Sequence, residues 1–338
     1  MKLSFYTYTL QLKHAFTLAT SSRKTTPIVL TEIHHNGFSG YGEASLPPYL
    51  NENQETVINF LRLVDFSPFE SNFSLPDMMD YIHSLSPGNY AAKASLDIAI
   101  HDLWGKLQHK PCYEIWNLNP ELSPKTSFTI GIDNPDTIKQ KLKESHPFSI
   151  IKVKLGADSD KTIIETIRSL TDKPICVDVN QGWHDKQLAL DMLAWCKERG
   201  VIFAEQPMPV NQLEDMAWLT QQDVLPIVAD ESFQHINDLN RIAGAFSGIN
   251  IKLMKCGGLQ QARLIIDEAK KLHLKIMLGC MTETSCAISA AAQLASLVDY
   301  TDLDGNLLIS NDCFSGATIV DGKVIPTNRP GIGILKNN

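Results

Sequence analysis

Charged side chains recur at the ends of short apolar segments in the second half of this chain. From Lys154 onward the recurrence is nearly regular, with intervals of 22 to 27 residues: Lys152 and Lys154, Asp178 and Asn180, Glu205, Asp230, and Lys252. One strand plus one covering helix has about this length, and in a parallel barrel the carboxyl ends of all strands open on one face. We therefore expect carboxylates and ammonium groups that are remote in sequence to meet around a bound cation.

The three acidic residues of this series, Asp178, Glu205 and Asp230, are candidate ligands for Mg²⁺, which prefers hard oxygen donors. The alternative is a surface ion-pair network. It is disfavoured because none of the three has an oppositely charged residue at helical spacing. Asn180 and Glu231 would orient the ligands, and the alternative role for Glu231 is to cap the following helix.

The lysines of the series suggest proton transfer. Lys154 and Lys252 lie on segments far apart in the expected barrel order, so they would approach a bound molecule from opposite sides and exchange protons on both faces of one carbon. A lysine acts as a base only when its pKa falls, and the ammonium of Lys152 together with a divalent cation would lower that pKa. Lys255 is predicted to be an ordinary exposed lysine.

Asp302 and Asp304 end the last apolar segment and have no basic residue beside them in the sequence. One interpretation is that they recognise the ammonium group of a substrate. The other is that Asp304 and Gly305 form an exposed turn. The residues alone do not separate these interpretations.

From about residue 125, short apolar runs alternate with amphipathic helices, which is typical of repeated βα units. The pattern predicts a modified TIM barrel, (β/α)7β, over residues 125–305, with eight strands at 127–132, 149–155, 174–180, 201–207, 226–231, 248–254, 274–279 and 297–304. Residues 1–124 combine predicted antiparallel strands with helices, the clearest at 90–109. We expect them to form an α+β capping domain that residues 306–338 complete.

The composition narrows the class of protein. The chain has 338 residues, a net charge of −8 and no basic face for a phosphate backbone, which argues against nucleic acid as a partner. No apolar run approaches the roughly 18 residues that cross a bilayer, and the first residues alternate like a strand rather than forming a secretory signal. Seven scattered cysteines without a CxxC pair argue against disulfides or a zinc site. We expect a cytoplasmic protein that binds no membrane, and a homo-oligomer stays open.

In its motifs the chain resembles the enolase superfamily, specifically the muconate-lactonizing branch and, within it, dipeptide epimerases such as the L-Ala-D/L-Glu epimerases. The resemblance spans nearly the whole chain and lies in KVK (152–154), DVNQ (178–181), EQP (205–207), ADES (229–232), NIKLMKCGG (250–258) and DLDG (302–305). It implies that Asp178, Glu205 and Asp230 hold Mg²⁺. It also implies that Lys154 and Lys252 are paired acid/base catalysts, assisted by Lys152.

The resemblance further implies how a substrate is chosen. Asp302 and Asp304 would bind the free α-ammonium of a dipeptide, and loops around 14–26 and 44–53 would select its side chains. Members that act on Ala-Glu tend to carry an arginine in the first loop, where this chain has Ser21, with Arg23 two residues on. We therefore expect Ser21 and Arg23 near the substrate, and a C-terminal substrate residue with an apolar or small side chain.

The expected activity is Mg²⁺-dependent epimerisation at the α-carbon of the C-terminal residue, by two-base proton transfer through an enediolate. An o-succinylbenzoate synthase or N-succinylamino acid racemase would share the lysines and the metal ligands. Its acylated substrate, however, offers no ammonium to Asp302 and Asp304. A metal-stabilised binding protein is the non-enzymatic alternative, and the intact pair of lysines disfavours it.

Overall fold

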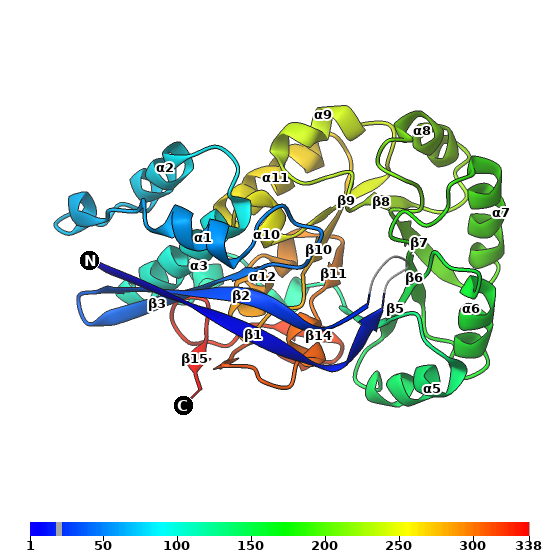
Figure 1. The fold of residues 1–338 in the computed structure, drawn as a ribbon, viewed down its shortest axis with the longest axis horizontal. Coiled ribbons are helices and arrows are strands. Elements are labelled where there is room, and N and C mark those ends of the chain that lie inside the picture. Colours follow the sequence, from blue (N-terminus) through cyan, green and yellow to red (C-terminus); the bar gives the residue numbers. More distant parts are fainter. Residues whose placement is uncertain (18–21, 338) are drawn as a thin grey trace.

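A barrel of eight parallel strands forms the larger part of the molecule (Figure 1), in a computed structural model that describes residues 1–17 and 22–337. The strands pair in sequence order, and a bridge between Thr126 and Thr301 joins the last to the first. All eight predicted strands are confirmed, each shorter than expected: β4 (Ser127–Ile130), β5 (Ile150–Lys154), β6 (Ile175–Asp178), β7 (Val201–Glu205), β8 (Ile227–Ala229), β9 (Gly248–Ile251), β10 (Lys275–Gly279) and β11 (Tyr300–Asp302).

Helices fill the seven connections between these strands, as predicted. They are α5 (Pro135–Glu144), α6 (Asp160–Arg168), α7 (Lys186–Lys197), α8 (Leu213–Gln221), α9 (Leu239–Ile242), α10 (Leu253–Cys256), α11 (Leu259–Lys271) and α12 (Ser285–Ala292). Polar residues start several of them. For example, the Asn134 side chain accepts hydrogen bonds from the second and third residues of α5.

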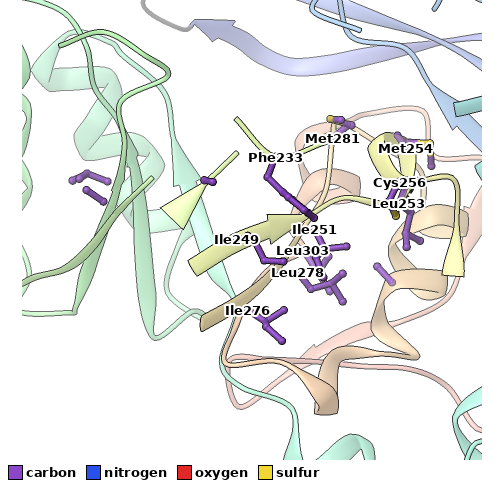
Figure 2. Close-up of a cluster of buried hydrophobic side chains, with 14 of the residues drawn as sticks. Phe233, Ile249, Ile251, Leu253, Met254, Cys256, Ile276, Leu278, Met281 and Leu303 are labelled. Carbon is purple, nitrogen blue, oxygen red and sulfur yellow. Dashed lines mark hydrogen bonds between the residues drawn. The ribbon is translucent and has the colours of Figure 1, made fainter. Parts of the chain in front are cut away.

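Side chains alternate between the outside and the inside of the barrel along each strand. The outside is apolar, and the inside has an apolar cluster with polar residues above it. Ile249 and Ile251 of β9 pack outside the barrel with Ile276 and Leu278 of β10 (Figure 2). Inside the barrel, a small apolar cluster consists of Cys176, Phe203, Val228 and Met277. The first three stand two residues before Asp178, Glu205 and Asp230, so the strand pleat places these acids directly above an apolar floor.

The amino-terminal part is an antiparallel sheet covered by helices, as predicted. Its strands are β1 (Lys2–Thr17), β2 (Ser22–His35) and β3 (Phe38–Ser45), and its helices are α1 (Gln54–Leu61), α2 (Leu75–Leu85), α3 (Tyr90–Leu107) and α4 (Cys112–Ile115). Asn36 and Gly37 both have positive φ in the hairpin turn between β2 and β3. Helix α3 lies so close to β3 that a Cβ at Gly40 would stand 2.1 Å from the Ala99 carbonyl oxygen.

Two buried carboxylates of this cap bind the amino ends of barrel helices. Asp97 of α3 accepts hydrogen bonds from the backbone N–H groups of Leu259 (2.6 Å) and Gln260 (3.2 Å) at the start of α11. Glu43 of β3 accepts from the backbone N–H of Thr284 (3.0 Å), the residue that caps α12. Because both contacts satisfy otherwise unpaired helix donors, they fix the cap over the barrel.

The carboxyl-terminal tail contains the short strands β12 (Phe314–Ser315), β13 (Thr318–Val320), β14 (Lys323–Ile325) and β15 (Leu335–Lys336). It contacts β1, since the Ser310 N–H donates to the Gln11 carbonyl (2.9 Å) and the Tyr8 hydroxyl donates to the Asn311 carbonyl (3.0 Å). The domain boundaries near residues 125 and 305 stay a prediction, which these contacts support.

Among residues 1–17 and 22–337, none of the helices combines the length and the apolarity that a bilayer-spanning segment needs.

Candidate active site

The three predicted metal ligands meet at the carboxyl ends of neighbouring strands. Asp178 ends β6, Glu205 ends β7, and Asp230 directly follows β8. All three side chains are buried, and one oxygen of each lies within 4.8 Å of the others. This geometry suits a small cation with carboxylate ligands.

Two lysines of β5 contact the same cluster. The Lys152 ammonium lies 2.7 Å from Glu205, 2.7 Å from Asp302 and 3.2 Å from Asp178. The Lys154 ammonium lies 2.5 Å from Oδ2 of Asp178. Burial disfavours the charge on Lys152, but the three acids outweigh burial and hold its pKa well above the ordinary value. Lys152 is therefore a fixed cation in the floor of the site.

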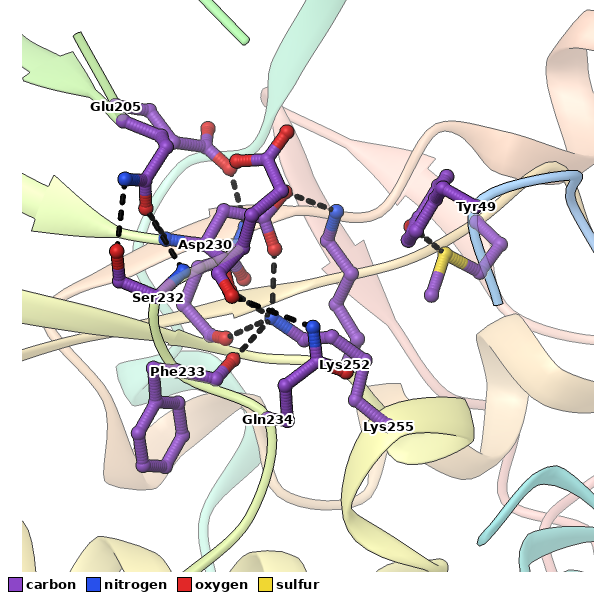
Figure 3. Close-up of polar contacts among 12 residues, drawn as sticks. Tyr49, Glu205, Asp230, Ser232, Phe233, Gln234, Lys252 and Lys255 are labelled. Atoms are coloured by element: carbon purple, nitrogen blue, oxygen red, sulfur yellow. Dashed lines mark hydrogen bonds and ion pairs between the residues drawn. The ribbon is translucent and has the colours of Figure 1, made fainter. Parts of the chain in front are cut away.

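Lys252 and Lys255 both bind Asp230 (Figure 3). Lys252 donates to Oδ2 at 2.7 Å, and Lys255 donates to Oδ1 at 2.6 Å. The prediction that Lys255 is exposed is wrong, because only 2% of it is accessible. The strand predicted to run to residue 254 ends at Ile251, and Lys255 lies in the short helix α10 that begins after Lys252, where its ammonium contacts Asp230.

Asn180 and Glu231 lie beside the carboxylate cluster. The Asn180 side-chain N–H donates to Oε1 of Glu231 at 3.2 Å. The alternative that Glu231 caps the next helix is wrong, since His235 is the N-cap of the 3₁₀ helix that follows, Ile236–Asp238. Among the described residues, Asn180 Oδ1 and Glu231 Oε2 are buried without a hydrogen-bond partner.

Asn250 is a site residue that the sequence interpretation missed. Its side-chain N–H donates to Oε1 of Glu205 at 2.7 Å and so orients that carboxylate. Asn250 shares the strand parity of Lys252, which was the available signal, but an isolated asparagine in an apolar strand gives no indication of its partner.

The acidic side chains of the site lie close together and repel one another, so positive charge stabilises their ionised forms. Burial and the neighbouring Asp178 raise the pKa of Glu205 to about 7, and burial and Asp230 raise the pKa of Glu231 to about 7. Asp230 differs, because Lys252 and Lys255 outweigh burial and hold its pKa well below the ordinary value. The oxygen donors and the excess of acidic groups fit a divalent cation of the Mg²⁺ type.

The lowering of the lysine pKa, predicted for a site that holds a divalent cation, stays a prediction for Lys252. Burial lowers its pKa, but Asp230 more than offsets burial, so the pKa stands well above the ordinary value. The prediction assumed a bound divalent cation, which would oppose the effect of these carboxylates.

Asp302 and Asp304 both lie at the site. Asp302 accepts a hydrogen bond from the Ser127 hydroxyl (2.6 Å) in addition to its ion pair with Lys152, and Asp304 accepts from the Thr129 N–H (2.7 Å). The alternative of an exposed turn at Asp304 is wrong, because its side chain is buried. Burial and Asp302 raise the pKa of Asp304 to about 7.

A cavity of about 630 Å³ lies above these residues, and residues of the cap form part of its wall. Both lysines of β5, Lys252, Asp230, Asp302 and Asp304 line it. From the cap come Arg23, whose guanidinium donates to the Thr282 hydroxyl at 3.2 Å, and Tyr49, whose ring centroid is 6.0 Å from the Lys252 ammonium. Ser21 lies outside the described residues.

Two family models match this chain. One, described as enolase C-terminal domain-like, matches residues 137–337. The other, described as the mandelate racemase / muconate lactonizing enzyme N-terminal domain, matches residues 4–116. Together they match most of the cap and the barrel from α5 onward.

Curated relatives and solved structures agree with these models. An L-Ala-D/L-Glu epimerase of Bacteroides thetaiotaomicron is 56% identical over 99% of this chain and 88% of the relative. An L-Ala-D/L-amino acid epimerase of a Maribacter species is 39% identical over the full length of both chains. A dipeptide epimerase from Methylococcus capsulatus, solved with Mg and the dipeptide L-Arg-D-Lys, is 29% identical, with a TM-score of 0.87 over 99% of each chain.

Proposed function

This chain belongs to the enolase superfamily, in the group of mandelate racemase and muconate lactonizing enzymes, and we propose that it inverts the α-carbon of the C-terminal residue of a dipeptide. One observation carries the proposal. Lys154 is on β5 and Lys252 directly follows β9, and in the closed strand order three strands separate β5 from β9 on either side. The two amines therefore reach the cavity from opposite walls.

The carboxylates of Asp178, Glu205 and Asp230 would hold Mg²⁺. When bound, the ion supplies the positive charge that a substrate carboxylate needs if the adjacent carbon is to lose a proton. Asn250 orients Glu205, and Asn180 with Glu231 lies beside the cluster.

The proton transfer itself uses the two lysines. The neutral amine of one lysine accepts the proton from the α-carbon, while the ammonium of the other donates a proton to the opposite face. Each turnover moves one proton onto a lysine and one proton off the other, so the net charge of the site is the same before and after turnover. The roles of the two lysines reverse for the opposite stereoisomer. Lys152 keeps its proton throughout because three acids surround it.

Asp302 and Asp304 would receive the free ammonium of the dipeptide. Both line the cavity, and each already accepts a hydrogen bond that fixes its position. A substrate acylated on nitrogen would leave these two buried acids facing an apolar or anionic group, which costs free energy. This supports a dipeptide over the N-succinyl substrates of the rival enzymes.

The substrate side chain is a separate question. The preference for an apolar or small side chain, inferred from Ser21, stays an untested prediction. Arg23 lines the cavity and is partly buried, and burial is the main cause of its lowered pKa. We therefore propose an acidic C-terminal residue, which would form a charge-assisted hydrogen bond with Arg23. The name of the Bacteroides relative supports the same choice.

A dipeptide panel in D₂O with Mg²⁺ tests the proposal. We expect deuterium at the α-carbon of the C-terminal residue, with L-Ala-L-Glu among the fastest substrates, measured by mass spectrometry and by chiral separation of the hydrolysed products. Label gained only by N-succinyl amino acids would favour the racemase alternative. No label from any of these compounds would favour a binding protein.

A further inference from the structure

Two ammonium groups hold the two oxygens of one carboxylate, but their surroundings differ (Figure 3). Lys252 lines the cavity, and its hydrogen bond goes to Oδ2 of Asp230. Lys255 is on the other side of Asp230, away from the cavity wall, where it binds Oδ1. The first lysine can therefore exchange its partner for a substrate, whereas the second is enclosed by protein.

Lys255 is surrounded by oxygen acceptors from two strand ends. Besides Oδ1 of Asp230 at 2.6 Å, its ammonium lies 2.9 Å from the carbonyl of Asp230, 2.8 Å from that of Phe233 and 3.0 Å from that of Asn250. An ammonium has three N–H donors, so these acceptors use all of them. The lysine thereby ties the loop after β8 to the end of β9, which carries Lys252.

We propose that Lys255 is a positioning residue, a buried counter-ion that holds Oδ1 of Asp230 and so fixes the orientation in which this carboxylate faces the site and Lys252. The inference rests on the proposed function. A carboxylate with a single ammonium partner at the cavity would keep that partner, and Lys252 would then be withheld from the substrate. With Lys255 in place, Asp230 retains a positive neighbour after Lys252 leaves.

Substitution of Lys255 by methionine separates positioning from simple charge. Removing a positive charge next to Asp230 should by Coulomb's law favour Mg²⁺ binding. Positioning predicts the reverse, a loss of Mg²⁺ affinity of about 10- to 100-fold, the usual effect of deleting a group that orients a metal ligand. Titration calorimetry with Mg²⁺ alone measures this without turnover. Unchanged or tighter binding in Lys255→Met would overturn the proposal.

Isotope exchange supplies a second readout that a merely weakened fold would not produce. The stereoisomer served by Lys252 is the one whose α-proton still exchanges in Lys154→Ala. In Lys255→Met, exchange from this isomer should fall at least tenfold more than exchange from the other, because Asp230 keeps Lys252. Equal losses for both isomers would contradict the inference. Absence of exchange in the unsubstituted enzyme would instead contradict the proposed function.

Lys141→Met is the matched control. Lys141 is also buried, and its ammonium is 3.4 Å from Asp133, but it lies on α5 and contacts none of the three proposed ligands. This variant should lose stability and keep both the Mg²⁺ affinity and the balance between isomers. Lys255→Gln, which retains two N–H donors, extends the comparison if the methionine variant does not fold.

NMR on the unsubstituted protein tests the role of Lys255 without relying on the folding of any variant. In NMR spectra of ¹⁵N-lysine-labelled protein, the ammonium of Lys255 should be protected from solvent and nearly unmoved by Mg²⁺, while that of Lys252 should shift. A Lys255 signal that moves as far as that of Lys252 would show that both partners of Asp230 are exchangeable and would overturn the proposal.

Discussion

Lys154 and Asp178 form an ion pair of 2.5 Å, so a residue proposed to move protons is bound to a residue proposed to hold the cation. Lys252 and Asp230 repeat this relationship across the barrel. Both amines thus supply positive charge to carboxylates of the ligand cluster. A bound Mg²⁺ would supply positive charge to the same carboxylates.

Mg²⁺ should therefore stabilise the protein. At a concentration one hundred times the dissociation constant, a ligand specific for the native state adds about 2.7 kcal/mol, which shifts the melting temperature by several degrees. Glu205→Gln should lose this shift because it removes one of three charged ligands. Thermal unfolding with Mg²⁺ and with EDTA provides the comparison. An equal shift in both proteins would place the cation elsewhere.

Arg23→Met should change the choice of substrate. Loss of a hydrogen bond to a charged group costs about 1.5–3 kcal/mol, or roughly a 10- to 150-fold fall in kcat/KM for L-Ala-L-Glu. L-Ala-L-Val should be affected little. The exposed Arg62 of the cap offers the control substitution Arg62→Met. A uniform loss over both dipeptides would assign Arg23 a structural role, and faster turnover of L-Ala-L-Val by the unsubstituted enzyme would restore the apolar preference.

Asp304→Asn tests recognition of the substrate ammonium. The variant should raise KM for a free dipeptide by roughly 10-fold or more, since a charge-assisted hydrogen bond becomes a neutral one. An N-acetylated dipeptide should be a poor substrate of the unsubstituted enzyme and should gain relative to the free dipeptide in Asp304→Asn. If acetylation makes no difference to either protein, Asp304 does not meet the ammonium.

Glu43 should make the stability of the protein depend on pH. Burial raises its pKa to about 7 from an ordinary value of 4.5, although hydrogen bonds from Thr284 lower it. The native state holds the proton of Glu43 more tightly than the unfolded state does. The contribution of this proton to the free energy of unfolding is therefore complete below pH 4.5 and is lost as the pH rises to about 7. The loss is about 3 kcal/mol at 1.36 kcal/mol per pKa unit.

Glu43→Gln resembles the protonated form and should remove this dependence. Urea unfolding in EDTA should show the variant gaining about 3 kcal/mol relative to the unsubstituted protein between pH 5 and pH 8. Glu121→Gln on the surface is the control and should follow the unsubstituted curve. A constant difference between Glu43→Gln and the unsubstituted protein would mean that Glu43 is ionised throughout.

The sequence predicted the barrel because its information is local and repeated. Each apolar run ends in a polar residue at a regular interval, and two-residue alternation assigns that residue to the inside of the barrel. Lys152, Asp178, Glu205 and Asp230 are therefore brought together by strand order alone. The same logic failed at Lys255, because strand parity was extended through residue 254 where a helix begins.

Other features depend on partners that no local pattern encodes. Asn250 contacts Glu205, which is 45 residues away, and Asp97 contacts Leu259, which is 162 residues away. The position of Arg23 depends on how the cap packs against the barrel. That packing joins segments that are far apart in the sequence. The ion pair between Lys152 and Asp302 was missed for the same reason, since the sequence placed no base beside Asp302.

The central claim is that Lys154 and Lys252 act on opposite faces of one carbon. Isomer-specific exchange in D₂O tests it most directly. Lys154→Ala and Lys252→Ala should each lose epimerisation by about 10²- to 10⁴-fold. Each should retain α-proton exchange from one stereoisomer of the dipeptide, and the retained isomers should be opposite. Retention of the same isomer in both variants, or full epimerisation in either, would contradict the two-lysine account.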